Sequence, residues 1–157
     1  MQVPTIRPYN KGDDEEICRV IHAVFDEYGF TWEAGGYNAD TEDVDAFYIK
    51  GGGAFWVMVI DGEIVGTGGL MPEVERRCEL CRLYLSHEYR GRGLGREFFD
   101  YIVNEARLAG YREMEIWSDA KLTDAHRLYE KSGAKFIGQR ICDDPDDSLE
   151  NGFLMLL

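Results

Sequence analysis

The sequence has no long apolar run: nowhere do about eighteen apolar residues follow one another, which is roughly the length that a membrane-spanning helix needs. The first residues, MQVPTIRPYNKGDDEE, also lack the apolar stretch of a secretory signal peptide. We therefore expect a cytoplasmic protein with no membrane partner.

Cysteine and histidine are scarce, with four residues of the first type and three of the second. Four cysteines in a chain of this size do not amount to a disulfide framework, which fits a reducing compartment. Cys78 and Cys81 form a CxxC pair, but residues three apart on a strand face opposite sides. Without a second pair or a histidine cluster to complete a site, we expect no metal.

Basic residues are outnumbered, with 17 lysines and arginines against 30 aspartates and glutamates, for a formal net charge of -13. Such a chain does not suit nonspecific binding to nucleic acids or anionic membranes, because phosphate groups demand clustered Lys and Arg. A cationic small molecule or a peptide amine suits it better, although acidity by itself also serves solubility. We expect no nucleic-acid partner.

The sequence does contain enough apolar material for one core, since 45% of its 157 residues are hydrophobic and 13% are aromatic. This length and composition predict a single domain spanning residues 1–157. No internal repeat and no linker divides the chain.

Hydrophobic periodicity predicts an α/β fold with a mixed sheet. A first helix begins where Asp13 and Glu16 have capping-box spacing, and Asp61-Gly62 predicts a tight hairpin between two antiparallel strands. We expect strands at 54–60, 63–70, 78–86, 113–117, 134–138 and 153–157, and helices at 13–28, 41–49, 94–110 and 123–133. With one further strand ahead of the first helix, the order is βααβββαβαββ, which predicts a mostly antiparallel central sheet flanked by helices.

The stretch YRGRGLGR at 89–96 stands between a predicted strand and the helix at 94–110. At a helix start, free backbone N–H groups and the helix dipole favour a phosphate, and glycines let the backbone approach it closely. Arg90, Arg92 and Arg96 add positive charge at the same place. The pattern indicates a phosphate or pyrophosphate site, with a glycine-rich turn bearing solvated arginines as the alternative. It is neither a P-loop nor the dinucleotide GxGxxG, which would need glycine in place of Arg96.

Residues Arg90 to Gly95 match the Gln/Arg-x-x-Gly-x-Gly/Ala signature of the GCN5-related N-acetyltransferases (GNAT), and the chain resembles this family over nearly its whole length. DGEIVGTGGL resembles the family's second and third strands, CELCRLYLSHEYRGRGLGREFFDYI its acyl-CoA strand, loop and helix, and AHRLYEKSGAKFIG its last helix and following strand. The resemblance implies an acetyl-CoA-dependent N-acetyltransferase. Such an enzyme moves an acetyl group to a primary amine of a small molecule or peptide by direct transfer in a ternary complex.

The resemblance also implies which residues hold acetyl-CoA. Backbone amides of the loop would bind the pyrophosphate, and backbone groups of the preceding strand would hold the pantetheine arm and the thioester carbonyl. The positions carried over are Leu83, Tyr84, Leu85, Arg90, Gly91, Arg92, Gly93, Leu94, Gly95 and Arg96. Leu83 and Leu85 would be core residues in any such strand, so their side chains do not distinguish a strand that binds acetyl-CoA from an ordinary core strand.

Two residues are candidate catalytic groups. Tyr129 in LYEKSG is similar in position to the tyrosine that many members place near the CoA sulfur, where a phenol can donate a proton; core packing is the alternative. Glu79 is similar in position to the general base of histone-acetylating members, and an ion pair with a neighbouring strand is its alternative. Strand alternation puts Glu79 on the face of Cys81, Leu83 and Leu85, where burial would raise its pKa.

Other residues remain candidates for the general base, and the sequence differs from the family pattern at two places. His126 and Asp119 remain candidate bases, as does water, although a lone helical histidine is more often packed or solvated. Leu122 replaces an asparagine that often contacts the pantetheine arm, and Gly133-Ala134 replaces the usual Gly-Phe.

The acceptor side is less defined. An acidic cluster lies between the last two predicted strands, near where the family's acceptor cleft opens: Asp143, Asp144, Asp146, Asp147 and Glu150. It favours a cationic amine acceptor, with a solvated acidic loop as the alternative.

A non-catalytic acyl-CoA-binding or sensing module stays open as a second function, while a tRNA-acetylating enzyme is disfavoured because no basic RNA-binding face is visible. Dimers are common in the family, so a homodimer is a further option, with FLMLL as an inner strand or an interface edge.

Overall fold

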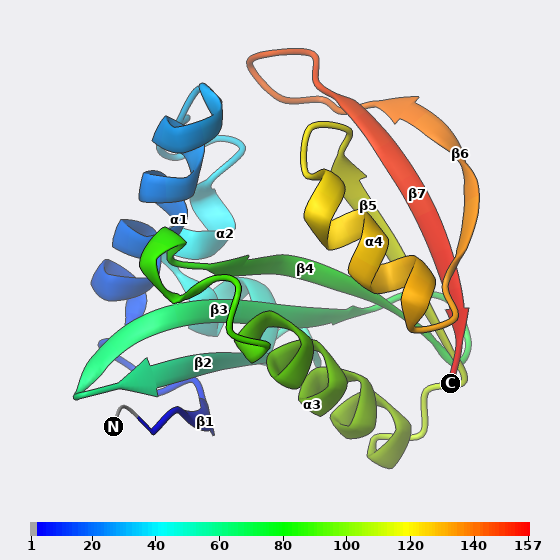
Figure 1. Ribbon diagram of the computed structural model, residues 1–157, viewed down its shortest axis with the longest axis horizontal. Coiled ribbons are helices and arrows are strands. Elements are labelled where there is room, and N and C mark those ends of the chain that lie inside the picture. Colours follow the sequence, from blue (N-terminus) through cyan, green and yellow to red (C-terminus); the bar gives the residue numbers. More distant parts are fainter. Residues whose placement is uncertain (1–2) are drawn as a thin grey trace.

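A sheet of seven strands, in the order β1-β2-β3-β4-β5-β7-β6, runs through the computed structural model, which describes residues 3–157 (Figure 1). The strands are β1 (Thr5–Pro8), β2 (Ala54–Ile60), β3 (Glu63–Pro72), β4 (Arg77–Leu85), β5 (Glu113–Asp119), β6 (Lys135–Ile141) and β7 (Leu149–Leu156). The helices are α1 (Asp14–Tyr28), α2 (Ala39–Glu42), α3 (Leu94–Leu108) and α4 (Thr123–Lys131), with a π-helical turn at Asp45–Ile49 and a 3₁₀ turn at His87–Tyr89. The predicted order βααβββαβαββ is confirmed.

Neighbouring strands pair antiparallel except β4 and β5, which pair in parallel. The expected mixed, mostly antiparallel sheet is therefore confirmed. The FLMLL segment belongs to β7, which lies between β5 and β6 and is an inner strand. The edge strand next to β7 is β6, where Phe136, Ile137 and Ile141 are exposed. A homodimer stays a prediction.

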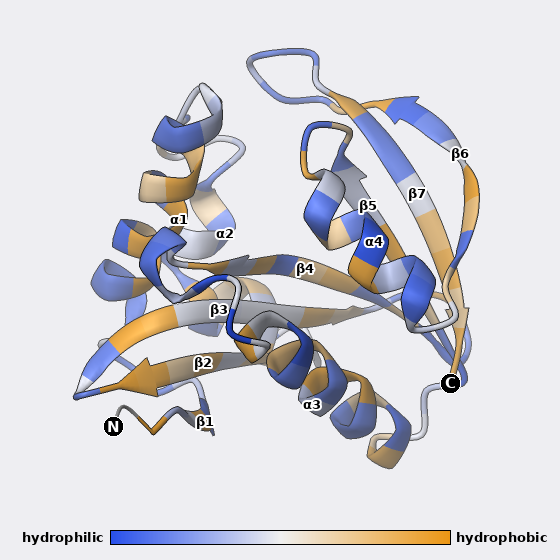
Figure 2. Ribbon diagram, in the orientation of Figure 1, coloured by the Kyte–Doolittle hydropathy of each residue, from blue (hydrophilic) through white to orange (hydrophobic). Residues whose placement is uncertain are grey.

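Helices cover the two faces of the sheet over separate apolar clusters (Figure 1). The cluster between α1 and the sheet includes Ile17, Ile21, Phe25, Phe55 and Ile64. The cluster beneath α3 and α4 includes Met58, Phe98, Phe99, Ile102, Ile116 and Tyr129. Figure 2 shows that β2 and β3, which contribute to both clusters, are among the most apolar segments. Burial of each large apolar side chain stabilises the fold by about 1.5–3 kcal/mol.

Two local predictions have different outcomes. Asp61 and Gly62 have φ values of 50° and 80°, as a two-residue hairpin turn with the right twist requires, so the predicted hairpin is confirmed. The predicted capping box is wrong, because the Asp13 side chain makes no cap hydrogen bond to α1. It pairs instead with Arg7 of β1, at 2.8 Å between Nη1 and Oδ2.

The pairing of β4 with β5 stops halfway along both strands. It joins Arg77–Leu80 to Glu113–Ile116, and the two strands separate beyond these residues. In Figure 1 the strands diverge toward the side where α1 and the β6–β7 loop lie. A gap thus opens in the middle of an otherwise continuous sheet.

A β-bulge at Arg82 changes which way the second half of β4 faces. Two residues of β4 oppose one of β3 there, and Arg82 has a φ of 53°, in the left-handed region. Cys81 packs on the α1 side of the sheet, whereas Leu83 and Leu85 pack on the α3 side. The prediction that Glu79 and Cys81 share a face with Leu83 and Leu85 is therefore wrong, because the extra residue reverses the alternation.

The cysteines lie as the strand pattern predicts. Cys78 packs in the α3 cluster and Cys81 against the α1 cluster, and all four cysteines are free thiols. Within residues 3–157, no three or more His, Cys, Asp or Glu side chains group so that they could hold a metal ion. In the same part of the chain, no helix combines the length and the apolar character needed to cross a membrane.

Candidate active site

The glycine-rich loop leads into the N-terminus of α3. Gly91 and Gly93 have φ values of 74° and 81°, which glycine adopts without strain, and Gly93 directly precedes the helix. A Cβ atom added at Gly91, Gly93 or Gly95 would meet no atom within 4 Å. Open space therefore lies before the first N–H groups of a 15-residue helix. These residues fit a pyrophosphate group, because such N–H groups and the helix dipole stabilise an anion.

The arginines of the loop differ in their surroundings. Arg90 turns toward α1: its Nε donates to the carbonyl of Leu85 at 2.9 Å, and its Nη1 pairs with Glu27 at 2.7 Å. Arg92 and Arg96 are exposed. The Arg90 side chain thus fastens the loop to α1, while the other two add positive charge on the surface beside the helix start.

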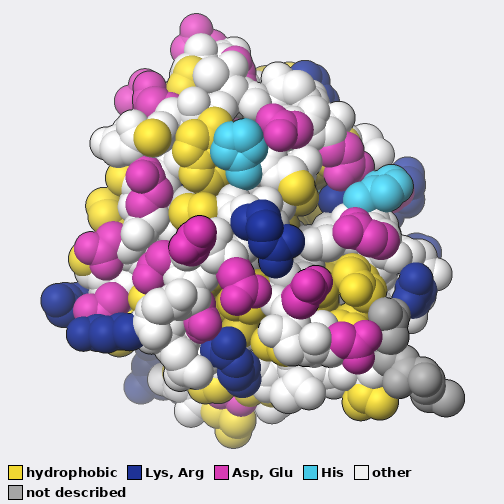
Figure 3. All heavy atoms as spheres, turned by 90° about the vertical axis from the view of Figure 1, so that its left-hand side faces the viewer, with side chains coloured by type: hydrophobic (Ala, Val, Ile, Leu, Met, Phe, Trp, Pro, Cys, Tyr) yellow, Lys and Arg dark blue, Asp and Glu magenta, His cyan; other side chains and the backbone are white. Residues whose placement is uncertain are grey.

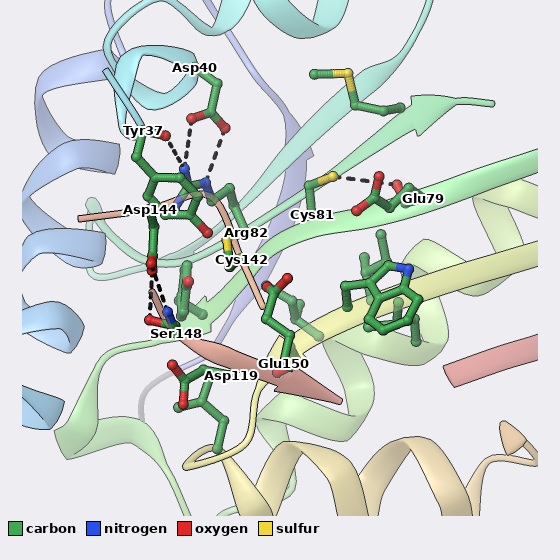
Figure 4. A pocket seen from close by; sticks show the side chains of 18 of the residues that line it. Tyr37, Asp40, Glu79, Cys81, Arg82, Asp119, Cys142, Asp144, Ser148 and Glu150 are labelled. Carbon is green, nitrogen blue, oxygen red and sulfur yellow. Dashed lines mark hydrogen bonds and ion pairs between the residues drawn. The ribbon is translucent and has the colours of Figure 1, made fainter. Parts of the chain in front are cut away.

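The gap between β4 and β5 opens into a cavity of about 610 Å³. On the gap side its walls come from β4, β5 and α4, through Leu83, Tyr84, Ile116, Ser118 and Tyr129. At the other end it is bounded by the α1–α2 loop, by α2 and by the β6–β7 loop (Figure 4). Of the strand residues expected to hold the pantetheine arm, Leu83 and Tyr84 line the cavity, and Leu85 packs against the α3 cluster.

Glu79 lines the same cavity. Burial, with the negative charges of Glu73, Glu115 and Glu150 adding to it, raises the pKa of Glu79 to about 7, although Arg140 acts in the opposite direction. A carboxyl group with that pKa exchanges protons readily near neutral pH. Burial is the main cause of the raised pKa of Glu79, as predicted, but carboxylates as well as apolar groups surround this residue.

Tyr129 lies on the buried face of α4. Its ring packs among Phe99, His126 and Phe153, with centroids 5.3, 6.3 and 5.7 Å away. Burial raises the pKa of Tyr129 above its ordinary value, so the phenol stays protonated at neutral pH. Tyr129 is therefore both a core residue and part of the cavity wall.

The other candidate bases are less well placed. His126 is 6% exposed and packs its ring against Phe153, and its Nε2 is buried without a hydrogen-bond partner among the described residues. Burial lowers the pKa of His126, which keeps the ring neutral. Asp119 does line the cavity, and one of its oxygens accepts the N–H of Lys121.

The acidic cluster is largely engaged within the protein. Asp144 accepts hydrogen bonds from the N–H and hydroxyl of Ser148, at 2.9 and 2.6 Å. Glu150 pairs with Nε of Arg140 at 2.9 Å. Asp146 accepts two hydrogen bonds from the α1–α2 loop. Only part of the negative charge of the acidic cluster is therefore directed at the cavity.

No sequence motif pointed to two arginines that line the cavity. Arg82 of β4 pairs with Asp40 of α2, and Arg140 of β6 stacks on Trp117 with its Cζ 4.3 Å from the ring centroid. Arg82 and Asp40 are 42 residues apart, so no short motif joins them. The one available signal was a charged residue inside the apolar strand CELCRLYLS.

Comparison with known proteins agrees with this geometry. Residues 19–134 match the acetyltransferase (GNAT) family. The chain is 33% identical to the uncharacterized N-acetyltransferase YjgM of Escherichia coli, over 87% of this chain and 84% of that protein. It is 30% identical to the N-acetylaspartate synthetase of Danio rerio over 65% of this chain, but spans only 37% of that protein.

Solved structures agree on the fold. A GNAT-family acetyltransferase from Staphylococcus aureus superposes with a TM-score of 0.87 at 21% identity, and the match covers 99% of both chains. YncA of Salmonella typhimurium, solved with its cofactor acetyl-CoA, superposes with a TM-score of 0.78 at 20% identity, covering 99% of this chain and 94% of that one. The chain belongs to the GNAT family of acetyltransferases.

Proposed function

We propose that this protein transfers an acetyl group from acetyl-CoA to a primary amine of a small molecule or a peptide. The observation that carries the proposal is the gap between β4 and β5, which opens into the cavity that Glu79 and Tyr129 line. A thioester entering through the gap would meet an amine held on the far side. Both substrates could therefore react directly, in one ternary complex.

The glycine loop and β4 would hold acetyl-CoA, which supplies the acetyl group as a thioester. The N–H groups at the start of α3 fit the pyrophosphate, and Gly91, Gly93 and Gly95 keep the approach open. Beyond Leu80, the β4 backbone has no β5 partner, so its N–H and C=O groups can form hydrogen bonds with the pantetheine amides. Arg92, Leu94 and Arg96 belong to the same proposed site.

Glu79 would accept the proton that the amine loses. A pKa of about 7 leaves a large share of Glu79 ionised at neutral pH, and a base is most effective when its pKa lies near the working pH. The proton would pass to a Glu79 carboxylate oxygen, directly or through one water, as the amine nitrogen bonds to the thioester carbon.

Tyr129 would assist departure of the sulfur. Its buried phenol is protonated and lies in the cavity wall where β4 and β5 separate. A thiol has an ordinary pKa of about 8.5, below that of a phenol, so the Tyr129 hydroxyl stabilises the leaving thiolate mainly as a hydrogen-bond donor. The C–S bond breaks, and the thiolate gains its proton from Tyr129 or from solvent.

Direct transfer is favoured over an acyl-enzyme. Both cysteines in the cavity wall are poor nucleophiles, because burial raises the pKa of Cys142 to about 11 and that of Cys81 further still. A thiolate at either residue would be rare at neutral pH.

The acceptor is proposed as a small or peptide amine rather than a nucleic acid. Figure 3 shows the face around α1, where Lys and Arg side chains are separated by Asp and Glu and form no continuous basic patch. A basic surface is the usual footprint of nucleic-acid binding. Cytoplasmic location stays a prediction.

Calorimetric titration with acetyl-CoA tests the cofactor site. Gly95 lies in the first turn of α3 with open space around it, so Gly95→Ala, Gly95→Asn and Gly95→Asp should all fold. We expect Gly95→Ala to bind like the native protein and Gly95→Asp to bind at least about tenfold more weakly, because its carboxylate would repel the pyrophosphate. Gly95→Asn separates the effect of charge from that of size. Absence of acetyl-CoA binding by the native protein would refute the proposal.

A further inference from the structure

The bulge in β4 has a second consequence, because it aims a charged side chain into the cavity. Arg82 occupies the left-handed region at φ 53°, where a residue other than glycine is strained. The Thr67 hydroxyl, which is fully buried, donates to the Arg82 carbonyl at 2.8 Å and fixes the bulge. In a regular strand Arg82 and Cys81 would face opposite sides, yet both line the cavity.

The guanidinium of Arg82 is held rigidly along one edge. Its Nε and Nη2 donate to the two carboxylate oxygens of Asp40, at 3.1 and 2.8 Å, and Nη2 also donates to the carbonyl of Tyr37 at 2.7 Å. The ring of Tyr37 covers the guanidinium, with Cζ 4.7 Å from its centroid. Figure 4 shows Arg82 between Asp40 and Tyr37. With a side chain only 8% exposed, Arg82 has little freedom to move.

At the opposite edge of the same guanidinium, Nη1 meets no hydrogen-bond acceptor with good geometry, although the phenol of Tyr84 lies close enough to interact with Arg82. Nη1 is buried and makes no hydrogen bond with any residue in the described range 3–157. Because Nε and Nη2 form the edge that meets Asp40, Nη1 lies on the other edge, where its two N–H groups are available. A buried donor on a charged group is costly to leave unpaired, which makes a ligand oxygen its natural partner.

The cavity also has the charge pattern of a site for a molecule with two ends. Glu73 and Glu79 interact with each other in one part of its wall, where Arg140 offsets only part of their negative charge. Arg82 lies three residues from Glu79 along β4. An ammonium group is attracted to the two glutamates, and after it has lost one proton to solvent, Glu79 can take the second as the nitrogen bonds to the thioester carbon. A carboxylate on the same molecule matches Nη1 of Arg82.

We propose that Arg82 binds the carboxylate of the acceptor, and that the acceptor is therefore an amino acid or another small primary amine bearing a carboxylate. This inference rests on the proposed acetyl transfer and names its substrate class. Arginine suits the role because its planar fork can bind one carboxylate through Nε and Nη2 and present Nη1 to another. Such an acceptor is a zwitterion, which adds a carboxylate to the cationic amine expected from the acidic cluster.

Matched acceptor pairs test the proposal. Each amino acid in a panel is compared with its carboxamide and its decarboxylated amine, first for binding to the CoA-loaded protein by thermal shift and calorimetry, then for CoA release. We expect the carboxylate compounds that bind to do so at least about tenfold more tightly than their partners, the effect of a charge-assisted hydrogen bond.

Arg82→Lys keeps the charge but loses the fork, and Arg77→Lys on the same strand, outside the cavity, is its control. Arg82→Lys should lose about 10- to 100-fold of the preference for carboxylates while its affinity for acetyl-CoA stays unchanged. Arg77→Lys should keep both. Equal loss for carboxylates and carboxamides, or no preference in the native protein, would overturn the proposal.

The two proposals fail differently. Turnover of amines without any preference for a carboxylate would remove the role of Arg82 and leave acetyl transfer standing. Selective binding of carboxylates without CoA release would support the role of Arg82 and refute the acetyl transfer.

Discussion

Thr31 and Asp146 join two loops that stand on either side of the cavity. The Thr31 N–H and hydroxyl donate to the two Asp146 oxygens at 2.7 and 2.6 Å, across 115 residues of sequence. Phe30 and Asp144, each close in sequence to this pair, line the cavity. The pair therefore links the α1–α2 loop to the β6–β7 loop beside the proposed acceptor end of the cavity.

Asp146→Ala should loosen this link. Because the pair is exposed, its contribution to stability is small, and the melting temperature should change little. We expect the acceptor KM to rise about two- to fivefold, since the loop residues that line the cavity become less ordered. Asp143→Ala removes the same charge from the same loop and should leave KM unchanged. Equal effects of the two substitutions in steady-state assays would show that charge, not the link, matters.

Tyr129→Phe removes one oxygen from a packed ring. The ring contacts with Phe99 and Phe153 remain, so the protein should be as stable as the native one. If the hydroxyl stabilises the leaving thiolate, kcat should fall about 10- to 100-fold with an unchanged affinity for acetyl-CoA. Stopped-flow measurement of thiol release, with calorimetry for binding, separates the two quantities. An unaltered kcat would favour core packing as the sole role of Tyr129, and no turnover in either protein would favour a non-catalytic acyl-CoA-binding module.

Glu79 should set the acidic limb of the pH–rate profile. As pH rises through about 7, Glu79 loses its proton and becomes able to act as base, so kcat/KM should increase with pH and then level off. Glu79→Gln should lose this limb and about 100-fold or more of activity. Glu73→Gln should move the limb to lower pH, because the charge of Glu73 raises the pKa of Glu79.

Acceptor amines of different basicity provide the control for that profile. A limb that belongs to Glu79 stays near pH 7 for every acceptor, whereas a limb from the acceptor moves with the acceptor's own pKa. A profile that Glu79→Gln leaves intact would transfer the role to Asp119 or to water.

The order of elements followed from local signals. Phe98, Ile102 and Ala106 recur at helical spacing and lie on one buried face of α3, and Asp61-Gly62 indicated the hairpin. These patterns involve residues close in sequence, so they can be recognised without knowledge of the tertiary structure. The glycine loop was visible for the same reason.

The features that shape the acceptor end depend on contacts between distant segments. Nothing in CELCRLYLS indicates that Arg82 adopts a left-handed φ, a conformation that glycine usually provides. The resulting β-bulge at Arg82 reversed the side of the sheet on which Leu83 and Leu85 were expected to lie. The capping box failed in the same way, because Arg7 competes for the Asp13 carboxylate. In both cases a tertiary partner decided between conformations that local sequence leaves open.

Glu79 should also make stability depend on pH in a direction opposite to that of most carboxyl groups. Its pKa is about 7 in the folded protein against an ordinary value of 4.5, so the folded state binds the proton more tightly than the unfolded state. The resulting stabilisation is fully present below pH 4.5 and is lost as the pH rises through about 7. Glutamine cannot ionise, so Glu79→Gln should melt a few degrees higher than the native protein at pH 8, and should lose that advantage at pH 5. Differential scanning calorimetry at both pH values checks this, with Glu63→Gln, an exposed glutamate of β3, as the control. A melting difference that is the same at both pH values would mean that Glu79 is solvated rather than buried, and the main support for its role as base would be gone.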